Sequence, residues 1–202
     1  VLEGDEYLSS PIDRRPKFHL YQPNIALISG IAWDHINVFP TYENYVNQFE
    51  IFIDKITNGG ILVYNAEDSE VKRVAEAATN PIRKMAYTTP NYEVKHGVTL
   101  LETPEGPMPI EVFGAHNLNN LAGAKWICQN MGVDEADFYE AIASFKGASK
   151  RLEKIAEGKG KVAYKDFAHS PSKVAATTKA VKEQYPDRTL VACLELHTYS
   201  SL

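Results

Sequence analysis

Short apolar runs alternate with segments of helical periodicity through the first half of the chain. Residues 24–29, 60–64 and 85–88 are brief, mainly apolar runs, which indicate buried strands. Residues 41–57 and 69–78 follow the first two runs and place apolar side chains three and four positions apart, as a helix packed on one face requires. This alternation predicts an α/β fold with a mostly parallel sheet covered by helices.

The pattern changes after residue 97. Residues 98–113 form two extended runs around the turn Thr103-Pro-Glu-Gly106, which predicts a β-hairpin. Helical periodicity returns at residues 117–131, where Gly132 closes the segment, and again at residues 134–145. The first domain is therefore predicted to combine a parallel sheet, a hairpin and several helices.

Residues 147–160 are rich in Gly, Lys and Glu, and this shift in composition predicts a domain boundary at residues 149 and 150. The residues beyond it predict one βαβ unit, with a strand at 161–167, a helix at 171–185 and a strand at 189–194. The chain is thus predicted to hold part of one α/β domain in residues 1–149 and the start of a Rossmann-like domain in residues 150–202.

Composition narrows the classes of partner. The 202 residues are 44% hydrophobic, which is enough for a core, and carry a formal charge of −5. A mildly acidic chain attracts neither duplex DNA nor an anionic membrane, so we expect no nucleic-acid and no membrane partner. Cys128 and Cys193 have no metal-ligand spacing, and no signal peptide or membrane span is visible, which favours a cytoplasmic protein. The chain lacks an initiator Met and stops directly after an apolar run, so we interpret it as a fragment.

The stretch from Gly114 to Asn120 is the most informative candidate site. Asn117 and Asn120 are three positions apart at the start of a predicted helix, so their carboxamides point the same way. Each carboxamide can donate and accept hydrogen bonds like the edge of a base, which makes adenine a candidate ligand. The alternative is an Asn helix cap after a Gly turn, which is a common arrangement.

Two acidic clusters lie in the first part of the chain. Glu3-Gly-Asp5-Glu6-Tyr7 brings three carboxylates within four residues, a set of oxygen ligands suited to Mg²⁺. Trp33-Asp34-His35 follows the first predicted strand, and open α/β sheets place their ligands at such strand ends. A solvated acidic turn and a hydrogen-bonded histidine are the alternative interpretations.

Two further clusters lie near the predicted boundary. Lys150 and Arg151 follow a glycine turn, and the planar fork of Arg suits a phosphate; a solvated basic turn is the alternative. Asp166 and His169 leave a predicted strand just before a helix, where an acid can bind ribose hydroxyls. His197 occupies the equivalent end of the next predicted strand.

Taken in order, these clusters resemble motifs of the Mur ligase superfamily. The family pattern G-x-H-N-x-x-N matches residues 114–120. F-x-G-x-x-R-R-x-E matches residues 145–153 with Lys150 in place of the first Arg, and D-D-F-A-H-H-P matches residues 165–171 with Lys165 in place of the first Asp and Ser170 in place of the second His. The chain is most similar to the murein peptide ligases, whose E-G-D-E-Y stands at residues 3–7 and whose F-D-H-x-x-x-F appears at residues 33–39 with Trp33 in place of the first Phe. The family's phosphate loop, G-T-x-G-K-T/S, and its N-terminal uridine-nucleotide domain have no counterpart here.

The resemblance implies a role for each matching residue. Metal-binding positions of the family fall on Glu3 and His35, adenine contacts on Asn117 and Asn120, a phosphate contact on Arg151, a ribose contact on Asp166, and positions near the incoming amine on His169 and His197. The implied cofactors are ATP and Mg²⁺. The implied substrates are UDP-N-acetylmuramate and murein peptides.

The activity implied by the resemblance is an ATP-dependent ligation of the murein tripeptide L-alanyl-γ-D-glutamyl-meso-diaminopimelate to UDP-N-acetylmuramate through an acyl phosphate, as in peptidoglycan recycling. Ligases that add L-alanine alone usually carry Ser-Asp after the first acidic triplet, whereas this chain has Tyr7-Leu8. The L-alanine ligase is the first alternative. A non-catalytic nucleotide- or metal-binding α/β module is the alternative of another class, and the fragment alone is expected to be inactive.

Overall fold

The computed structural model describes residues 1–195 and resolves them into two compact units. The first unit contains Val1–Thr88 and Gly123–Met131. The second contains Thr89–Ala122 and the described residues from Gly132 onward. The helix that spans residues 115–130 contributes to both units. The predicted domain boundary at residues 149 and 150 stays a prediction.

A three-stranded parallel sheet is the centre of the first unit. Its strands β1 (Ile25–Ile28), β2 (Ile61–Asn65) and β3 (Arg83–Tyr87) lie in the order β1-β2-β3. Ile61 is in register with Ile25 on one side and with Arg83 on the other. The three strands and their parallel pairing confirm the prediction from the apolar runs.

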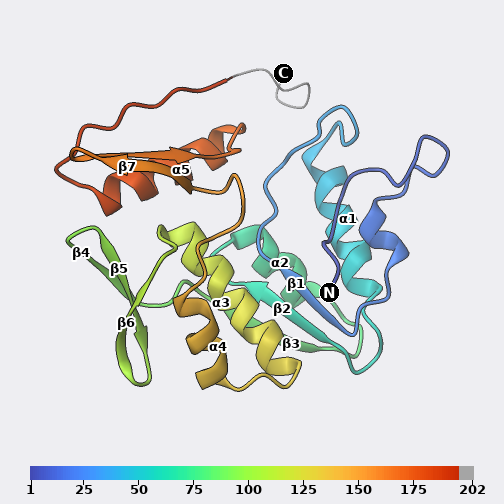
Figure 1. Ribbon diagram of the computed structural model, residues 1–202. Helices are drawn as coiled ribbons and strands as arrows, with labels where there is room; N and C mark the ends of the chain where they lie inside the picture. Colours follow the sequence, from blue (N-terminus) through green and yellow to red (C-terminus); the bar gives the residue numbers. More distant parts are fainter. Residues whose placement is uncertain (196–202) are drawn as a thin grey trace. The chain divides into compact units, whose positions relative to one another are not determined.

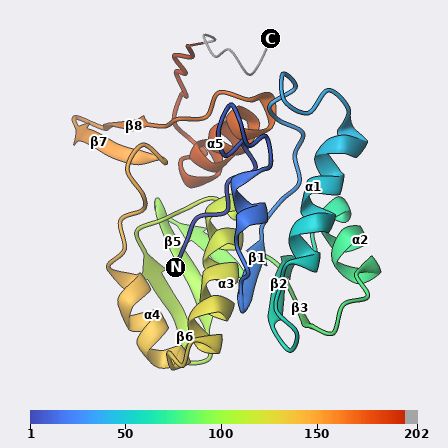
Figure 2. The same ribbon diagram turned by 90° about the vertical axis from the view of Figure 1, so that its right-hand side faces the viewer.

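Helices cover both faces of this sheet (Figures 1 and 2). On one face, Ala26 and Leu62 are buried in a core that also contains side chains of α1 (Tyr42–Asp54) and α2 (Ser69–Ala77). On the other face, Leu27 lies against Gly123 of α3 (Ala115–Asn130). Successive strand residues point to opposite faces, so a sheet covered on both sides needs continuous apolar runs rather than alternation.

The second unit contains an antiparallel sheet of three strands. The predicted hairpin is confirmed by β5 (Val98–Thr103) and β6 (Gly106–Ile110), and β4 (Tyr92–Lys95) adds a strand at the edge of β5. Helix α4 (Glu135–Ala143) packs against β6. The chain then passes to α5 (Pro171–Gln184) through a second hairpin, visible at the level of β7 in Figure 1.

The second hairpin corrects the predicted βαβ unit. Strand β7 (Glu153–Gly158) lies inside the segment interpreted as a boundary, and it pairs antiparallel with β8 (Lys161–Lys165). The predicted βαβ unit is therefore wrong in the described residues, because β8 has β7 as its partner and residues 189–194 form no strand. Within residues 1–195, no helix combines the length and apolarity needed to cross a membrane.

Candidate functional site

The start of α3 is built by a glycine turn. Gly114 has φ of 87°, a left-handed conformation that favours glycine, and its carbonyl oxygen accepts hydrogen bonds from the backbone amides of Asn117 and Leu118. The side-chain amide of Asn117 donates to the carbonyl oxygen of Phe113 at 2.9 Å. This bond fixes the Asn117 carboxamide directly at the helix entrance.

The three asparagines in the first two turns of α3 have different environments. Asn119 is buried, and its amide donates to Thr89 Oγ1 at 3.2 Å, which identifies it as a structural residue. Asn117 is half-buried and Asn120 is exposed. Both predicted adenine contacts are at least partly accessible, and their common orientation and their role stay predictions.

Asp166 follows β8 and uses both carboxylate oxygens within the unit. Its Oδ2 accepts from the backbone amide of Leu152 at 2.7 Å, and its Oδ1 accepts from that of Ala168 at 2.6 Å. The hydroxyl of Thr177 on α5 lies 3.4 Å from the same Oδ1. In this conformation the predicted ribose contact therefore ties the turn after residue 150 to the start of α5.

His116 is a neighbour of Asp166. Burial lowers the pKa of His116, and the negative charge of Asp166 acts in the opposite direction. The ring of His116 also lies close to Gly114. This histidine is therefore packed beneath the helix entrance and connects that entrance electrostatically to Asp166.

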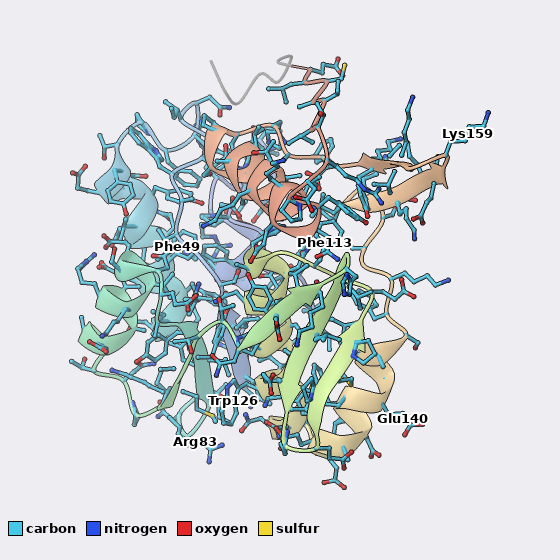
Figure 3. All side chains as sticks on the ribbon, turned by 90° about the vertical axis from the view of Figure 1, so that its left-hand side faces the viewer. Phe49, Arg83, Phe113, Trp126, Glu140 and Lys159 are labelled. Atoms are coloured by element: carbon cyan, nitrogen blue, oxygen red, sulfur yellow. The ribbon has the colours of Figure 1, made fainter. Side chains whose placement is uncertain are left out.

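Arg151 lies on an exposed turn whose next residue is anchored in a small core. Leu152 is buried with Phe113 and Ala180. Figure 3 shows Phe113 beneath α5, the helix that carries Ala180. Since Phe113 also binds Asn117, and Leu152 binds Asp166, this core gathers three of the predicted nucleotide-binding residues in one part of the unit.

The two histidines predicted to lie near the incoming amine have different outcomes. His169 is half-buried just before α5, with Nδ1 2.9 Å from the carbonyl oxygen of Phe167 and its ring edge-on to the Phe167 ring at 5.2 Å. His197 lies outside the described residues. The role of each histidine stays a prediction.

The candidate metal position is in the first unit. His35 Nε2 lies 3.3 Å from Glu6 Oε1, and the Tyr7 ring meets the His35 ring edge-on at 5.0 Å. Glu6 also accepts a hydrogen bond from the hydroxyl of Tyr45, whose pKa is raised, chiefly by burial and further by the charge of Glu6. The structure thus pairs His35 with Glu6, the third carboxylate of the acidic cluster.

Glu3, the predicted partner of His35, is exposed. Within residues 1–195 no cluster of three or more His, Cys, Asp or Glu side chains has the geometry of a metal site. Mg²⁺ usually keeps several waters and takes only one or two protein carboxylates together with phosphate oxygens. The carboxylates beside His35 fit an ion held in that way, and the shared Glu3–His35 site stays a prediction.

The sequence did not single out three supporting residues. Tyr45 donates a hydrogen bond to Glu6, Asp68 accepts one from the amide of Ile31, and Glu153 accepts one from the amide of Lys150. Glu153 closes a recognised motif, but nothing in the spacing indicates what its side chain binds. Their roles depend on turn and loop geometry, which residue spacing alone does not specify.

A family model described as the Mur ligase middle domain matches residues 7–128. Among curated proteins, the UDP-N-acetylmuramate–L-alanine ligase of Roseiflexus sp. (strain RS-1) is 26% identical over 227 residues, covering 99% of this chain and 47% of that ligase. The protein of the same name from Streptococcus gordonii is 29% identical over 212 residues, covering 99% of this chain and 45% of its own length. The chain therefore spans less than half the length of these relatives.

Solved structures show the same fold. MurF from Acinetobacter baumannii superposes with a TM-score of 0.67 at 20% identity, covering 80% of this chain and 38% of that one. A murein peptide ligase from Psychrobacter arcticus superposes with a TM-score of 0.61 at 22% identity, covering 92% of this chain and 40% of that one. At these identities the likeness concerns the arrangement of helices and strands.

Proposed function

Because this chain belongs to the Mur ligase family, we propose that it is part of an ATP-dependent ligase that forms a carbon–nitrogen bond. The proposed reaction joins L-alanyl-γ-D-glutamyl-meso-diaminopimelate to UDP-N-acetylmuramate. ATP activates the muramoyl carboxylate as an acyl phosphate, and the L-alanyl amine of the peptide attacks it. The proposed location is the cytoplasm, with peptidoglycan recycling as the process served.

The observation that carries this proposal is the gathering of Asn117, Arg151 and Asp166 around the core of Phe113, Leu152 and Ala180. These residues are far apart in sequence, and each matches a nucleotide contact in the family motifs. An amide, a guanidinium and a carboxylate are suited to a base, a phosphate and a ribose respectively. One ATP molecule therefore accounts for all three.

The remaining candidate residues have roles that the same chemistry requires. Asn120 would add a second amide to the adenine contact. Glu3 and His35, with Glu6 beside them, would hold Mg²⁺, which offsets negative charge on the transferred phosphoryl group. His169 and His197 would lie near the incoming amine. Water must be excluded from this site, because it would hydrolyse the acyl phosphate.

The second candidate is a UDP-N-acetylmuramate–L-alanine ligase. The curated relatives described above carry that name, which favours it. The acidic cluster followed by Tyr7-Leu8 and the motif at residues 33–39 favour the tripeptide ligase. The two candidates share every step except the choice of amine.

Side-by-side measurements of kcat/KM with the two acceptors, on the full-length protein that contains this chain, distinguish the candidates. We expect the tripeptide to be used at least about tenfold more efficiently than free L-alanine, a difference of about 1.4 kcal/mol in transition-state binding. Equal or reversed efficiencies would establish the L-alanine ligase instead. Nucleotide binding without phosphate release under either condition would support a non-catalytic module.

A further inference from the structure

The turn that carries Arg151 has an unusual backbone. Lys150 and Leu152, the residues on either side of Arg151, have φ of 58° and 48°. Residues with a Cβ rarely adopt this left-handed region, and each such residue costs about 1–2 kcal/mol relative to the right-handed conformation. Two of them so close together require interactions that hold the turn in place.

Glu153 supplies one of these interactions. Its Oε2 accepts a hydrogen bond from the backbone amide of Lys150 at 2.8 Å, and the hydroxyl of Ser149 lies 3.3 Å from the same oxygen. The bond to the Lys150 amide is the main cause that lowers the pKa of Glu153, so the carboxylate is ionised at neutral pH. A charged acceptor makes a stronger bond to a backbone amide than a neutral one.

The hairpin of β7 and β8 fixes the position of Glu153. Glu153 is the first residue of β7 and lies opposite Lys165, the last residue of β8. Asp166 follows directly and binds the amide of Leu152 at 2.7 Å, while the Leu152 side chain is buried in the core beside Phe113. The turn is therefore held on both sides of Arg151 by carboxylates at the base of one hairpin.

The side chain of Arg151 itself takes no part in this arrangement. It is exposed, and no described acidic side chain forms an ion pair with it. A guanidinium on a fixed turn loses less conformational freedom when it binds a phosphate than one on a mobile loop. The backbone is thus constrained on both sides of Arg151, while the Arg151 side chain is left exposed.

We propose that Glu153 is a positioning residue, which holds the left-handed turn at Lys150 and thereby directs Arg151 toward the phosphates of ATP. This proposal rests on the proposed function. Glu153 does not contact the nucleotide, since its oxygen is bound to the turn and a second negative charge would repel phosphate. Its contribution is made entirely through the backbone of residues 149–152.

The test uses Glu153→Ala and a rescue by Lys150→Gly in the full-length protein. Glycine adopts the left-handed conformation without steric cost, so it removes the need for the carboxylate. Glu153→Gln keeps an oxygen acceptor and is the conservative variant. Glu157→Ala is the matched control, because Glu157 lies on the same strand but pairs with Lys154 at 2.9 Å.

We expect Glu153→Ala to raise the KM for ATP about tenfold, the effect of losing roughly one hydrogen bond to a charged group. The kcat at saturating ATP and acceptor should change much less. The double variant Glu153→Ala with Lys150→Gly should return to within about threefold of the parent KM, because glycine relieves a strain of the same order. Glu157→Ala should stay close to the parent, and Glu153→Gln, which keeps a neutral acceptor, should lie between the parent and Glu153→Ala.

Amide hydrogen exchange of Lys150, measured without nucleotide, separates this proposal from the proposed function. We expect the Lys150 amide to exchange at least about tenfold faster in Glu153→Ala. If exchange is faster but the protein does not use ATP, the proposed ligase reaction is wrong, while the role of Glu153 in holding the turn stands. Unchanged exchange would overturn the positioning role. A KM defect that Lys150→Gly fails to rescue would overturn it as well, because the carboxylate would then act by another route.

Discussion

At the scale of single residues, left-handed backbone conformations separate into two groups. His96 and Lys159 each precede a glycine in the tight turn of a hairpin, where this conformation is usual. Lys159 marks the tip of the second hairpin in Figure 3. The other three non-glycine residues in this conformation among residues 1–195 are His35, Lys150 and Leu152, which are, or directly flank, predicted site residues.

The left-handed conformation of His35 is held by several bonds. Its backbone amide donates to Asp34 Oδ1 at 2.8 Å, and its carbonyl oxygen accepts from the amides of Val38 and Phe39 at 2.8 and 2.9 Å. The imidazole is simultaneously paired with Glu6. Backbone strain persists only where the surroundings determine it, and such positions concentrate at functional sites. The candidate metal position at His35 and the candidate phosphate-binding turn at Arg151 therefore share a left-handed backbone that is held by hydrogen bonds.

Gly114 is the residue whose replacement we expect to be most damaging at the entrance of α3. A Cβ at this position would collide with Ala180 of α5 and would also impose a side chain on φ of 87°. We predict that Gly114→Ala lowers the free energy of unfolding by about 2–5 kcal/mol, the sum of a left-handed backbone penalty and overpacking. Chemical denaturation of the purified variant measures this change.

The matched control is Gly132→Ala. Gly132 has φ of 92°, but a Cβ there would meet nothing within 4 Å. This variant should lose only the backbone part, about 1–2 kcal/mol. Equal losses in the two variants would contradict the close packing of Gly114 against α5.

At the scale of elements, Asp68 connects the start of α2 to the loop after β1. Its Oδ1 accepts from the amides of Glu70 and Val71, both at 3.0 Å, as the N-cap of α2. Its Oδ2 accepts from the amide of Ile31 at 3.1 Å. One carboxylate therefore stabilises a helix and also fixes the beginning of the loop that leads to His35.

Two substitutions of Asp68 separate its role as the N-cap of α2 from its bond to the Ile31 amide. Asp68→Asn keeps an oxygen for the cap, since Asn is as good an N-cap as Asp, but presents an NH₂ group to the Ile31 amide. Asp68→Ala removes both interactions. We predict that Asn costs about 0.5–1.5 kcal/mol of stability and that Ala costs about 1 kcal/mol more.

Thermal or urea denaturation gives both values, and amide exchange at Ile31 reports on the loop. Exchange at Ile31 should increase in both variants by a similar factor, because both lose the same acceptor. If Asp68→Asn left the Ile31 exchange unchanged, the carboxylate would not be what holds the loop.

Most elements with a continuous or helical apolar pattern were predicted correctly, and the hairpin of β5 and β6 was located by its turn residues. Strands β1 to β3 are covered on both faces, so their sequences are apolar runs that stand out from their surroundings. Strand β7 was missed because five of its six residues are exposed, which leaves no hydrophobic alternation to detect. A hairpin that is mostly solvated is rich in polar residues and glycine, and residues 147–160 were therefore interpreted as a domain boundary.

The candidate nucleotide site was also predictable in part, because some of its residues lie at positions that the sequence pattern marks. Asn117, Arg151 and Asp166 lie at a helix start, a glycine turn and a strand end, positions that spacing can locate. The bonds of Glu153 and Glu6 were not predictable, because they depend on backbone conformations at Lys150 and His35 that residues with a Cβ seldom adopt. Sequence patterns therefore indicated the side chains that suit a ligand, but not the residues whose hydrogen bonds hold those side chains in position.

At the scale of the whole molecule, the second unit joins residues on both sides of the predicted boundary. Gln184, at the end of α5, is buried and bridges two partners on the antiparallel sheet. Its side-chain oxygen accepts from the hydroxyl of Thr99 at 2.9 Å, and its amide donates to the carbonyl oxygen of Gly97 at 2.7 Å. Tyr92 and Glu183 form a further hydrogen bond of 2.7 Å beside this bridge.

This bridge allows the association of α5 with the sheet to be measured. Thr99 is fully buried on β5, so Gln184→Ala leaves its hydroxyl without a partner, a loss of about 1–3 kcal/mol. Thr99→Val removes the hydroxyl while keeping the shape of the side chain. If α5 packs on β5 in solution, the two substitutions should be coupled, and the double variant should be more stable than the sum of the single losses predicts.

A double-mutant cycle by urea denaturation gives the coupling energy. We predict at least about 0.5 kcal/mol, the lower limit for residues that share a hydrogen bond. Two domains that meet only at residues 149 and 150 would give additive losses, because Thr99 and Gln184 would then unfold in separate transitions. Coupling would show that residues 89–122 and the α5 segment are stabilised together, so that α5 depends on the sheet that precedes the predicted boundary.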